Sequence, residues 1–219
     1  TLGDLGRNTV AMERSVEYKG SLEQFTPDMR FTIANMTAEF GGLNGVFEAD
    51  EQVARWLERR GAHKDEARYF KADHNAEYVG RYEIDLSHME PQLAQPFSPD
   101  NVHNLSEVAG MGLDGAFIGA CTTTEEELVL AALVLEQALA SGAKPTTSDK
   151  RLVIPGDLSI AKHLQETGLA DVYERAGFKV GVPGCSMCLG IASEKASDGE
   201  VWITSQNRNY QNRMGAGSL

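Results

Sequence analysis

From residue 114 onward, short apolar runs alternate with longer amphipathic stretches. The amphipathic stretches predict helices over residues 124–140 and 160–175, and the first of them begins with a Thr124 cap and an acidic first turn. The apolar runs predict strands, which we place at residues 116–119, 152–154, 179–182 and 201–204. Because strands that alternate with helices pair in parallel, the pattern predicts an α/β fold, a three-layer α/β/α arrangement with a mainly parallel sheet.

Before residue 114 the pattern is less regular, but it still predicts helices and strands. Pro27 and Asp28 mark the start of a helix that runs to the Gly41–Gly42 pair. The residues that recur at helical spacing, and that we expect to face the core, are Met29, Ile33, Met36 and Phe40. The other elements predicted in this half are a strand at 14–18, a helix from 50 to about 61 and a strand at 78–86.

The connection between the two halves is extended. Pro91, Pro96 and Pro99 rule out a helix over residues 89–101, because proline removes a backbone donor and clashes with the preceding turn. We therefore place a domain boundary here, with a first α/β portion over residues 1–97 and a second α/β domain over residues 98–219.

Composition narrows the possible partners. The chain has 219 residues, of which 42% are hydrophobic, and a net charge of −12. This charge argues against nucleic acid and against an anionic membrane surface as partners. No apolar run is long enough for a membrane span and no signal peptide is recognisable, so we expect a reducing compartment, the cytoplasm or the mitochondrial matrix. Because the sequence begins at Thr1 and stops soon after a motif, we expect it to be part of a longer protein.

The three cysteines carry the clearest chemistry. Cys185 and Cys188 form a C-x-x-C turn, and Cys121 lies far upstream. A closed structural zinc site uses four ligands, and iron–sulfur clusters are normally held by four cysteines. A cluster held by three would leave one iron without a protein ligand, free to act as a Lewis acid. The alternatives at this point are buried apolar cysteines and a redox pair, although the surroundings are not thioredoxin-like.

The placement of these residues favours a shared metal site. Cys121 follows the first predicted strand of the parallel sheet, and Cys185 and Cys188 follow the third. Asn207 and Arg208 follow the fourth. Ligands of open parallel sheets bind beyond the carboxyl ends of the strands, so these side chains are expected at one edge.

Arg208 and Arg213 add a binding function to that edge. The planar guanidinium group of arginine binds carboxylates through two parallel hydrogen bonds. Beside a metal centre, the two arginines indicate a small polycarboxylate as the ligand.

Several blocks of the sequence, in the same order, resemble the aconitase superfamily of iron–sulfur hydro-lyases, which includes the large subunits of 3-isopropylmalate dehydratase and homoaconitase. The cysteine blocks and the Asn-Arg-Asn block are the most specific. The blocks that carry the resemblance are residues 16–18, 35–39, 98–101, 118–122, 183–189 and 207–213.

The resemblance implies a 4Fe–4S cluster bound by three cysteines, with the fourth iron open to the substrate. It also implies that Asn35 and Glu39 lie next to the cluster and its bound water, as catalytic residues. Substrate-binding positions beside the cluster are implied for Asn207 and Arg208, and a contact with a substrate carboxylate for Arg213. The cluster ligands that the resemblance implies are Cys121, Cys185 and Cys188.

The implied activity is the dehydration and rehydration of a hydroxy di- or tricarboxylic acid, such as 3-isopropylmalate, homocitrate or citrate. Two departures from the family pattern stand out. Thr123 occupies a position where the family usually has an asparagine near the cluster, and the family's catalytic serine base and swivelling domain have no counterpart here. We therefore expect a small subunit or a swivelling domain to supply the base, and the chain alone to be inactive.

Two other functions stay open on the sequence. The Pro-Gly-Cys-x-x-Cys turn at residues 183–188 faintly resembles that of zinc deaminases, but their signature also needs a His-x-Glu motif, which His63-Lys64-Asp65 does not supply. The chain is alternatively a cluster-free scaffold or regulatory module of the same fold. None of the five histidines lies in a histidine motif of the family: His63, His74, His88, His103 and His163.

Overall fold

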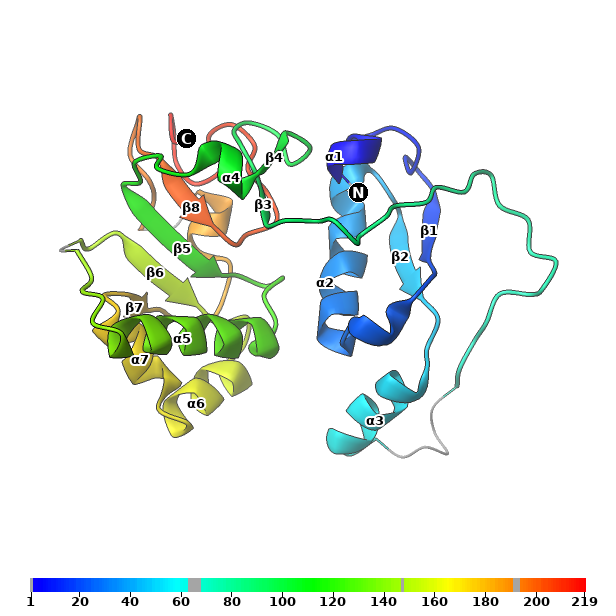
Figure 1. Ribbon diagram of the computed structural model, residues 1–219, viewed down its shortest axis with the longest axis horizontal. Coiled ribbons are helices and arrows are strands. Elements are labelled where there is room, and N and C mark those ends of the chain that lie inside the picture. Colours follow the sequence, from blue (N-terminus) through cyan, green and yellow to red (C-terminus); the bar gives the residue numbers. More distant parts are fainter. Residues whose placement is uncertain (1, 63–67, 147, 191–193) are drawn as a thin grey trace. The chain divides into compact units, whose positions relative to one another are not determined.

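A computed structural model describes residues 2–62, 68–146, 148–190 and 194–219, and Figure 1 traces the chain. The chain divides into two units, Thr1–Met89 and Glu90–Leu219. The boundary placed from the sequence, between residues 97 and 98, lies eight residues further along the chain than the division after Met89. The proline-containing connector therefore belongs to the second unit.

The first unit is built around two parallel strands joined by a helical crossover. Strand β1 pairs with β2 in a register that places Val16 beside Gly45 and Tyr18 beside Phe47. The helix between them begins at Pro27, as the sequence predicts, and Thr26 caps it by accepting a hydrogen bond from the Met29 N–H. The elements of this unit are α1 (Leu2–Leu5), β1 (Ser15–Tyr18), η1 (Leu22–Gln24), α2 (Pro27–Met36), η2 (Thr37–Phe40), β2 (Asn44–Phe47) and α3 (Glu51–Arg59).

The predicted core stripe of α2 is only partly correct. Phe40 is buried, but 39% of Met29 is exposed, and the neighbouring Arg30 is buried in its place with 3% exposed. The reason is a polar network, described below, in which backbone carbonyls and a carboxylate surround the guanidinium group of Arg30. Charged groups enter an interior when such partners are present.

The strand predicted at residues 78–86 does not form. These residues have no regular structure, and Val79 and Tyr82 are exposed. Their alternating pattern suits a strand, but within the described part of the first unit only β1 and β2 pair, and residues 78–86 have no partner strand. A strand needs a neighbour to satisfy its backbone groups.

The second unit contains the parallel sheet that the sequence predicts. Its strands run in the order β7-β6-β5-β8, and every neighbouring pair is parallel. A separate antiparallel pair, β3 with β4, precedes it. The elements are β3 (Gln92–Ala94), β4 (Val102–Asn104), α4 (Leu105–Val108), β5 (Gly115–Gly119), α5 (Glu125–Ala140), β6 (Arg151–Ile154), α6 (Leu158–Glu166), α7 (Leu169–Arg175), β7 (Lys179–Val180), η4 (Ser186–Leu189) and β8 (Trp202–Thr204).

Local sequence sets the helix ends of this unit. Helix α5 begins with a capping box, in which Thr124 and Glu127 each bond the other's backbone N–H. The single helix predicted over residues 160–175 is wrong, because two helices, α6 and α7, occupy this stretch. Gly168 separates them with a φ of +77°, a conformation that ends a helix and that glycine adopts without strain.

The two faces of the sheet are covered differently. Helices α5, α6 and α7 lie together along one face (Figure 1), where Leu128, Leu164 and Tyr173 pack against Val153 of β6. On the other face, the turn η4 and the C-terminal segment bring Met187, Cys188, Ala196 and Met214 against the sheet residues Phe117, Leu152 and Ile154. This second face therefore holds Cys188 of the C-x-x-C turn in the core, whereas Cys185 is exposed. Within the described residues, the helices are too short or too polar to cross a membrane.

Candidate functional site

The loop that carries Cys121 leaves the end of β5 through a sharp turn. Gly119 has a φ of +124°, and a Cβ on it would overlap the carbonyl oxygen of Ile154 at the end of β6. Only glycine tolerates both the conformation and the close approach. The next residue, Ala120, also has a positive φ, of 80°, and is fully buried. The turn places Cys121, which is exposed, just past the carboxyl end of β5.

The turn that carries the other two cysteines is fixed at both ends. At its start, the Gly184 N–H donates to the Pro155 carbonyl, just past β6, at 3.4 Å. The Cys188 N–H donates to the Cys185 carbonyl at 2.9 Å, which closes η4. At its end, Gly190 has a φ of +65°, and a Cβ there would come within 2.5 Å of the Arg213 carbonyl oxygen. The cysteine turn and the Arg213 segment are therefore in direct backbone contact.

The third loop at this edge follows β8 and is tied to the first. Ser205 accepts a hydrogen bond from the Gly119 N–H through its Oγ at 2.9 Å, and its own N–H donates to the Phe117 carbonyl at 3.1 Å. Asn207 and Arg208 follow directly. The carboxyl ends of β5, β7 and β8 therefore lead into the three segments that carry the cysteines, Asn207 and the two predicted arginines, because these strands are parallel.

The charges of the other two cysteines act on Cys121. Cys188 is buried, whereas Cys121 and Cys185 are exposed, and all three are free thiols. Partial burial raises the pKa of Cys121, and the charges of Cys185 and Cys188 raise it further. The charge of Arg208 acts in the opposite direction and lowers the pKa of Cys121. Thiolates that repel one another in this way are stabilised by a shared cationic centre.

Arg213 reaches the same sulfur set from the C-terminal segment. Its Nη2 donates to Cys188 Sγ at 3.7 Å, and its Nε is buried without a partner among the described residues. Asn209 donates through Nδ2 to the carbonyls of Ala94 and Gln95, at 3.2 and 2.8 Å, which ties this segment to β3. Asn209 belongs to the Asn-Arg-Asn block, but the sequence predicts no separate role for it or for Gln206. The dense run of amides after β8 was the available signal.

The side chain of Thr123, the residue expected from the resemblance to be an asparagine, bonds within its own loop. Its hydroxyl donates to the Gly119 carbonyl at 2.7 Å, and its side chain is buried. Its backbone N–H donates to the Ala120 carbonyl at 3.1 Å. Thr123 therefore stabilises the turn that presents Cys121.

Asn35 and Glu39 belong to the first unit and do not share a face there. Asn35 is exposed on α2, whereas Glu39 is buried on η2. The α-helix gives way to a 3₁₀-helix at Thr37, and the tighter winding rotates the side chains that follow. Thr37 anchors this junction, because its hydroxyl bonds to the hydroxyl of Tyr18 at 2.8 Å and to the Ile33 carbonyl at 3.3 Å.

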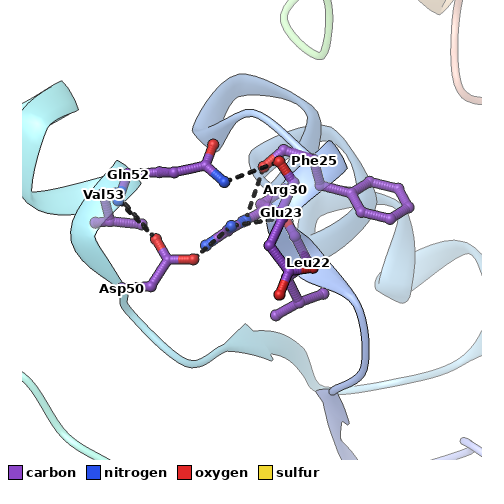
Figure 2. Close-up of polar contacts among 7 residues, drawn as sticks. All are labelled: Leu22, Glu23, Phe25, Arg30, Asp50, Gln52 and Val53. Carbon is purple, nitrogen blue, oxygen red and sulfur yellow. Dashed lines mark hydrogen bonds and ion pairs between the residues drawn. The ribbon is translucent and has the colours of Figure 1, made fainter.

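Arg30 forms a further polar cluster in the first unit that the sequence analysis missed (Figure 2). Its Nε donates to the Phe25 carbonyl at 3.1 Å, and its Nη2 donates to the Leu22 carbonyl at 2.9 Å and to Asp50 Oδ2 at 2.7 Å. Asp50 in turn caps α3 by accepting from the backbone N–H groups of Gln52 and Val53. One guanidinium group thus joins η1, α2 and α3.

The donor set at the sheet edge consists of three free thiols, the ligand type of iron–sulfur clusters. Among the residues that the structure describes, no three His, Cys, Asp or Glu side chains are grouped to hold one metal ion. In a 4Fe–4S cluster each cysteine binds a different iron, so the sulfurs need not converge on one point. Three thiols on loops at one edge are the type of ligand that such a cluster uses. The segment 63–65, considered for a zinc site, lies outside the described residues.

A comparison with protein families identifies the fold and the motifs together. The model of the aconitase family (aconitate hydratase) matches residues 2–112 and 106–219, which together cover nearly the whole chain. The chain belongs to the aconitase family. Its resemblance to this family, inferred from the cysteine and Asn-Arg-Asn blocks, is therefore confirmed.

Individual members of the aconitase family are also similar over the whole chain. Aconitase htyD of Aspergillus rugulosus is 46% identical over 221 residues, which cover 100% of this chain and 25% of that protein. The 3-isopropylmalate dehydratase large subunit gloJ of Glarea lozoyensis is 46% identical over 220 residues, which cover 99% of this chain and 25% of that protein. The 3-isopropylmalate dehydratase large subunit of Aquifex aeolicus is 37% identical over 217 residues, which cover 98% of this chain and 50% of that protein. The chain thus spans a quarter to a half of these relatives.

Proposed function

We propose that the chain is the cluster-bearing part of an aconitase-type hydro-lyase, which dehydrates and rehydrates a hydroxy di- or tricarboxylic acid such as 3-isopropylmalate, homocitrate or citrate. The main support for the proposal is that three thiols and two arginines follow strands of the parallel sheet at the same edge. Cys121 lies after β5, Cys185 and Cys188 after β7, and Arg208 and Arg213 after β8. The names of the relatives, aconitase and 3-isopropylmalate dehydratase, support the reaction class.

The ligands of a 4Fe–4S cluster in this proposal are Cys121, Cys185 and Cys188. When bound by three cysteines, such a cluster supplies a Lewis-acidic iron that polarises the leaving hydroxyl group of the substrate. The protein's part is to hold three thiolates on rigid turns. The Gly119 turn and the Gly190 turn do this, because neither accepts a side chain without displacing neighbouring backbone.

The remaining residues of this edge bind and orient the substrate. Arg208 and Arg213 neutralise carboxylates, and their planar donor groups fix the orientation of the acid. Arg213 also donates to Cys188 Sγ, which holds its guanidinium group beside the thiol set. Asn207 offers an amide from the same loop. With a net charge of −12, the chain needs these local arginines to attract an anionic substrate.

Asn35 and Glu39 are assigned to positions next to the open iron and its water, on the strength of the family motif. Elimination of water also requires a base that takes the proton from the carbon next to the one that carries the hydroxyl group. The chain matches relatives named as large subunits, and a small subunit or swivelling domain is the proposed source of that base. The chain alone is then expected to bind the acid without turnover.

Anaerobic reconstitution with iron and sulfide tests the proposal. The wild-type chain is expected to take up both and to show broad visible absorbance. Cys121→Ala, Cys185→Ala and Cys188→Ala are each expected to reduce the bound iron and sulfide sharply, whereas Ser141→Ala, an exposed control after α5, is expected to match the wild type. Uptake of zinc in place of iron and sulfide, or full cluster content in Cys121→Ala, would show the proposal to be wrong.

A further inference from the structure

Buried polar atoms without partners concentrate in the segment after β8. Among the described residues, five buried side-chain nitrogen or oxygen atoms have no hydrogen-bond partner, and four of them lie within residues 206–213. They are Gln206 Nε2, Gln206 Oε1, Asn209 Oδ1 and Arg213 Nε. Most buried polar groups in native proteins are paired, so a local concentration of unpaired ones calls for a physical reason.

Gln206 differs from the other two residues. Asn209 uses its Nδ2 on two backbone carbonyls, and Arg213 uses its Nη2 on Cys188 Sγ. Gln206 has neither end of its amide bonded to a described residue. Leaving a buried donor and a buried acceptor unpaired destabilises a fold, and an apolar side chain of the same shape would avoid that cost.

The backbone holds Gln206 at the proposed substrate-binding edge. The Gln206 N–H donates to Thr204 Oγ1 at 3.1 Å, directly past the end of β8. The preceding residue, Ser205, bonds to Gly119 at the start of the Cys121 loop. Gln206 therefore lies between β8, which pairs with the strand that leads into Cys121, and the segment that carries Arg208 and Arg213.

The unpartnered atoms restrict the chemistry of a ligand. Gln206 Nε2 and Arg213 Nε are donors, whereas Gln206 Oε1 and Asn209 Oδ1 are acceptors. A carboxylate only accepts hydrogen bonds, so it satisfies the donors and leaves the acceptors unpaired. A hydroxyl group donates. A hydroxy acid provides both kinds of group, whereas the unsaturated acid formed by loss of water lacks the donor.

We infer that Gln206 is a substrate-binding residue, whose amide accepts a hydrogen bond from the hydroxyl group of a hydroxy acid and donates one to a carboxylate. This inference rests on the proposed function and adds a residue that distinguishes the hydroxy acid from its dehydrated or deoxy forms. A site that recognises a hydroxyl group by hydrogen bonding rejects analogues without it, because its own polar groups are then left unpaired.

The first test measures the stability of the chain before reconstitution. In Gln206→Met an apolar side chain of similar length replaces the amide, which removes the unpaired groups. The thermal midpoint of this variant is expected to rise by about 2–4 °C. Gln211→Met, an exposed position in the same segment, is the matched control and is expected to shift the midpoint by less than about 1 °C. A fall in the Gln206→Met midpoint would mean that the amide is structurally bonded, which overturns the inference.

The second test measures binding to the reconstituted full chain by titration calorimetry. Two hydroxy acids, citrate and 3-isopropylmalate, are compared with their deoxy analogues, tricarballylate and isopropylsuccinate. The wild type and Gln211→Met are expected to bind at least one hydroxy acid more tightly than its analogue. Gln206→Met is expected to lose about tenfold or more of the affinity for that hydroxy acid, and most of the preference.

The two tests separate this inference from the proposed function. If the wild-type chain takes up no iron and sulfide, the proposed function fails, and the midpoint of Gln206→Met still decides whether the amide is bonded within the fold. If the cluster forms but Gln206→Met binds all four acids as the wild type does, the inference fails and the proposed function stands. Absence of binding of all four acids to the reconstituted wild type would also overturn the inference.

Discussion

Asp50→Ala is predicted to destabilise the first unit more than loss of a helix cap alone. Asp50 has two partners in the structure: its Oδ1 caps α3, and its Oδ2 pairs with Nη2 of Arg30 at 2.7 Å (Figure 2). Loss of an N-cap costs about 1 kcal/mol. Arg30 is only 3% exposed, so the substitution also leaves a buried charge without its carboxylate.

The size of the second effect follows from the burial of the pair. A hydrogen bond to a charged group contributes about 1.5–3 kcal/mol, and the lower half of that range applies because 40% of the Asp50 side chain is exposed. Asp50→Ala is therefore expected to lower the free energy of unfolding by about 2.5–3 kcal/mol. Asp50→Asn keeps the cap and loses the charge, so it is expected to cost about 1–2 kcal/mol.

Asp157→Ala is the matched control. Asp157 caps α6 by accepting from the N–H groups of Ser159 and Ile160 and from the Ser159 hydroxyl group, and within the described residues it makes no ion pair. Its replacement is expected to cost only the cap, about 1 kcal/mol.

Urea unfolding followed by tryptophan fluorescence measures both positions, because each unit has one tryptophan. Trp56 in α3 reports on the first unit in a Trp202→Phe background, and Trp202 in β8 reports on the second unit in a Trp56→Phe background. Each substitution is compared with its own background. Equal losses for Asp50→Ala and Asp157→Ala, within about 0.5 kcal/mol, would refute the reasoning that Arg30 depends on Asp50.

Two further predictions concern the second unit. Hydrogen bonds from Lys150, from the Ser197 backbone and from Trp202 lower the pKa of Glu200 from 4.5 to about 2. The stability that these bonds contribute is complete above pH 4.5 and is lost as the pH falls towards 2, so the free energy of unfolding should fall less steeply with pH in Glu200→Gln than in the wild type over that window. Identical slopes would contradict the assignment. Gly119→Ala should cost more than about 2 kcal/mol in urea unfolding, because the new Cβ would overlap the Ile154 carbonyl at a φ of +124°; a wild-type midpoint would show that the turn adapts.

Much of the second unit could be predicted because its signals are local. Thr124 and the acidic residues after it start α5 through bonds made within one turn, and the apolar runs of β5, β6 and β8 lie where the pattern places them. The edge that collects Cys121 and Cys185 followed from the same pattern, because parallel strands bring their carboxyl ends together whatever the loops contain. Gly168 was a local signal as well, and its positive φ explains why one predicted helix is two.

The alternation of strands and helices, their caps, and the edge of the sheet that leads into the cysteine and arginine segments therefore follow from the sequence alone. Which polar side chains are buried depends instead on tertiary packing. Arg30 is buried while Met29 is exposed, because the partners of the guanidinium group come from η1 and from Asp50, up to 20 residues away in the chain. The buried amide of Gln206 is likewise set by the packing around it. Burial of polar groups depends on partners brought together in space, and such partners leave no periodic signal in the sequence.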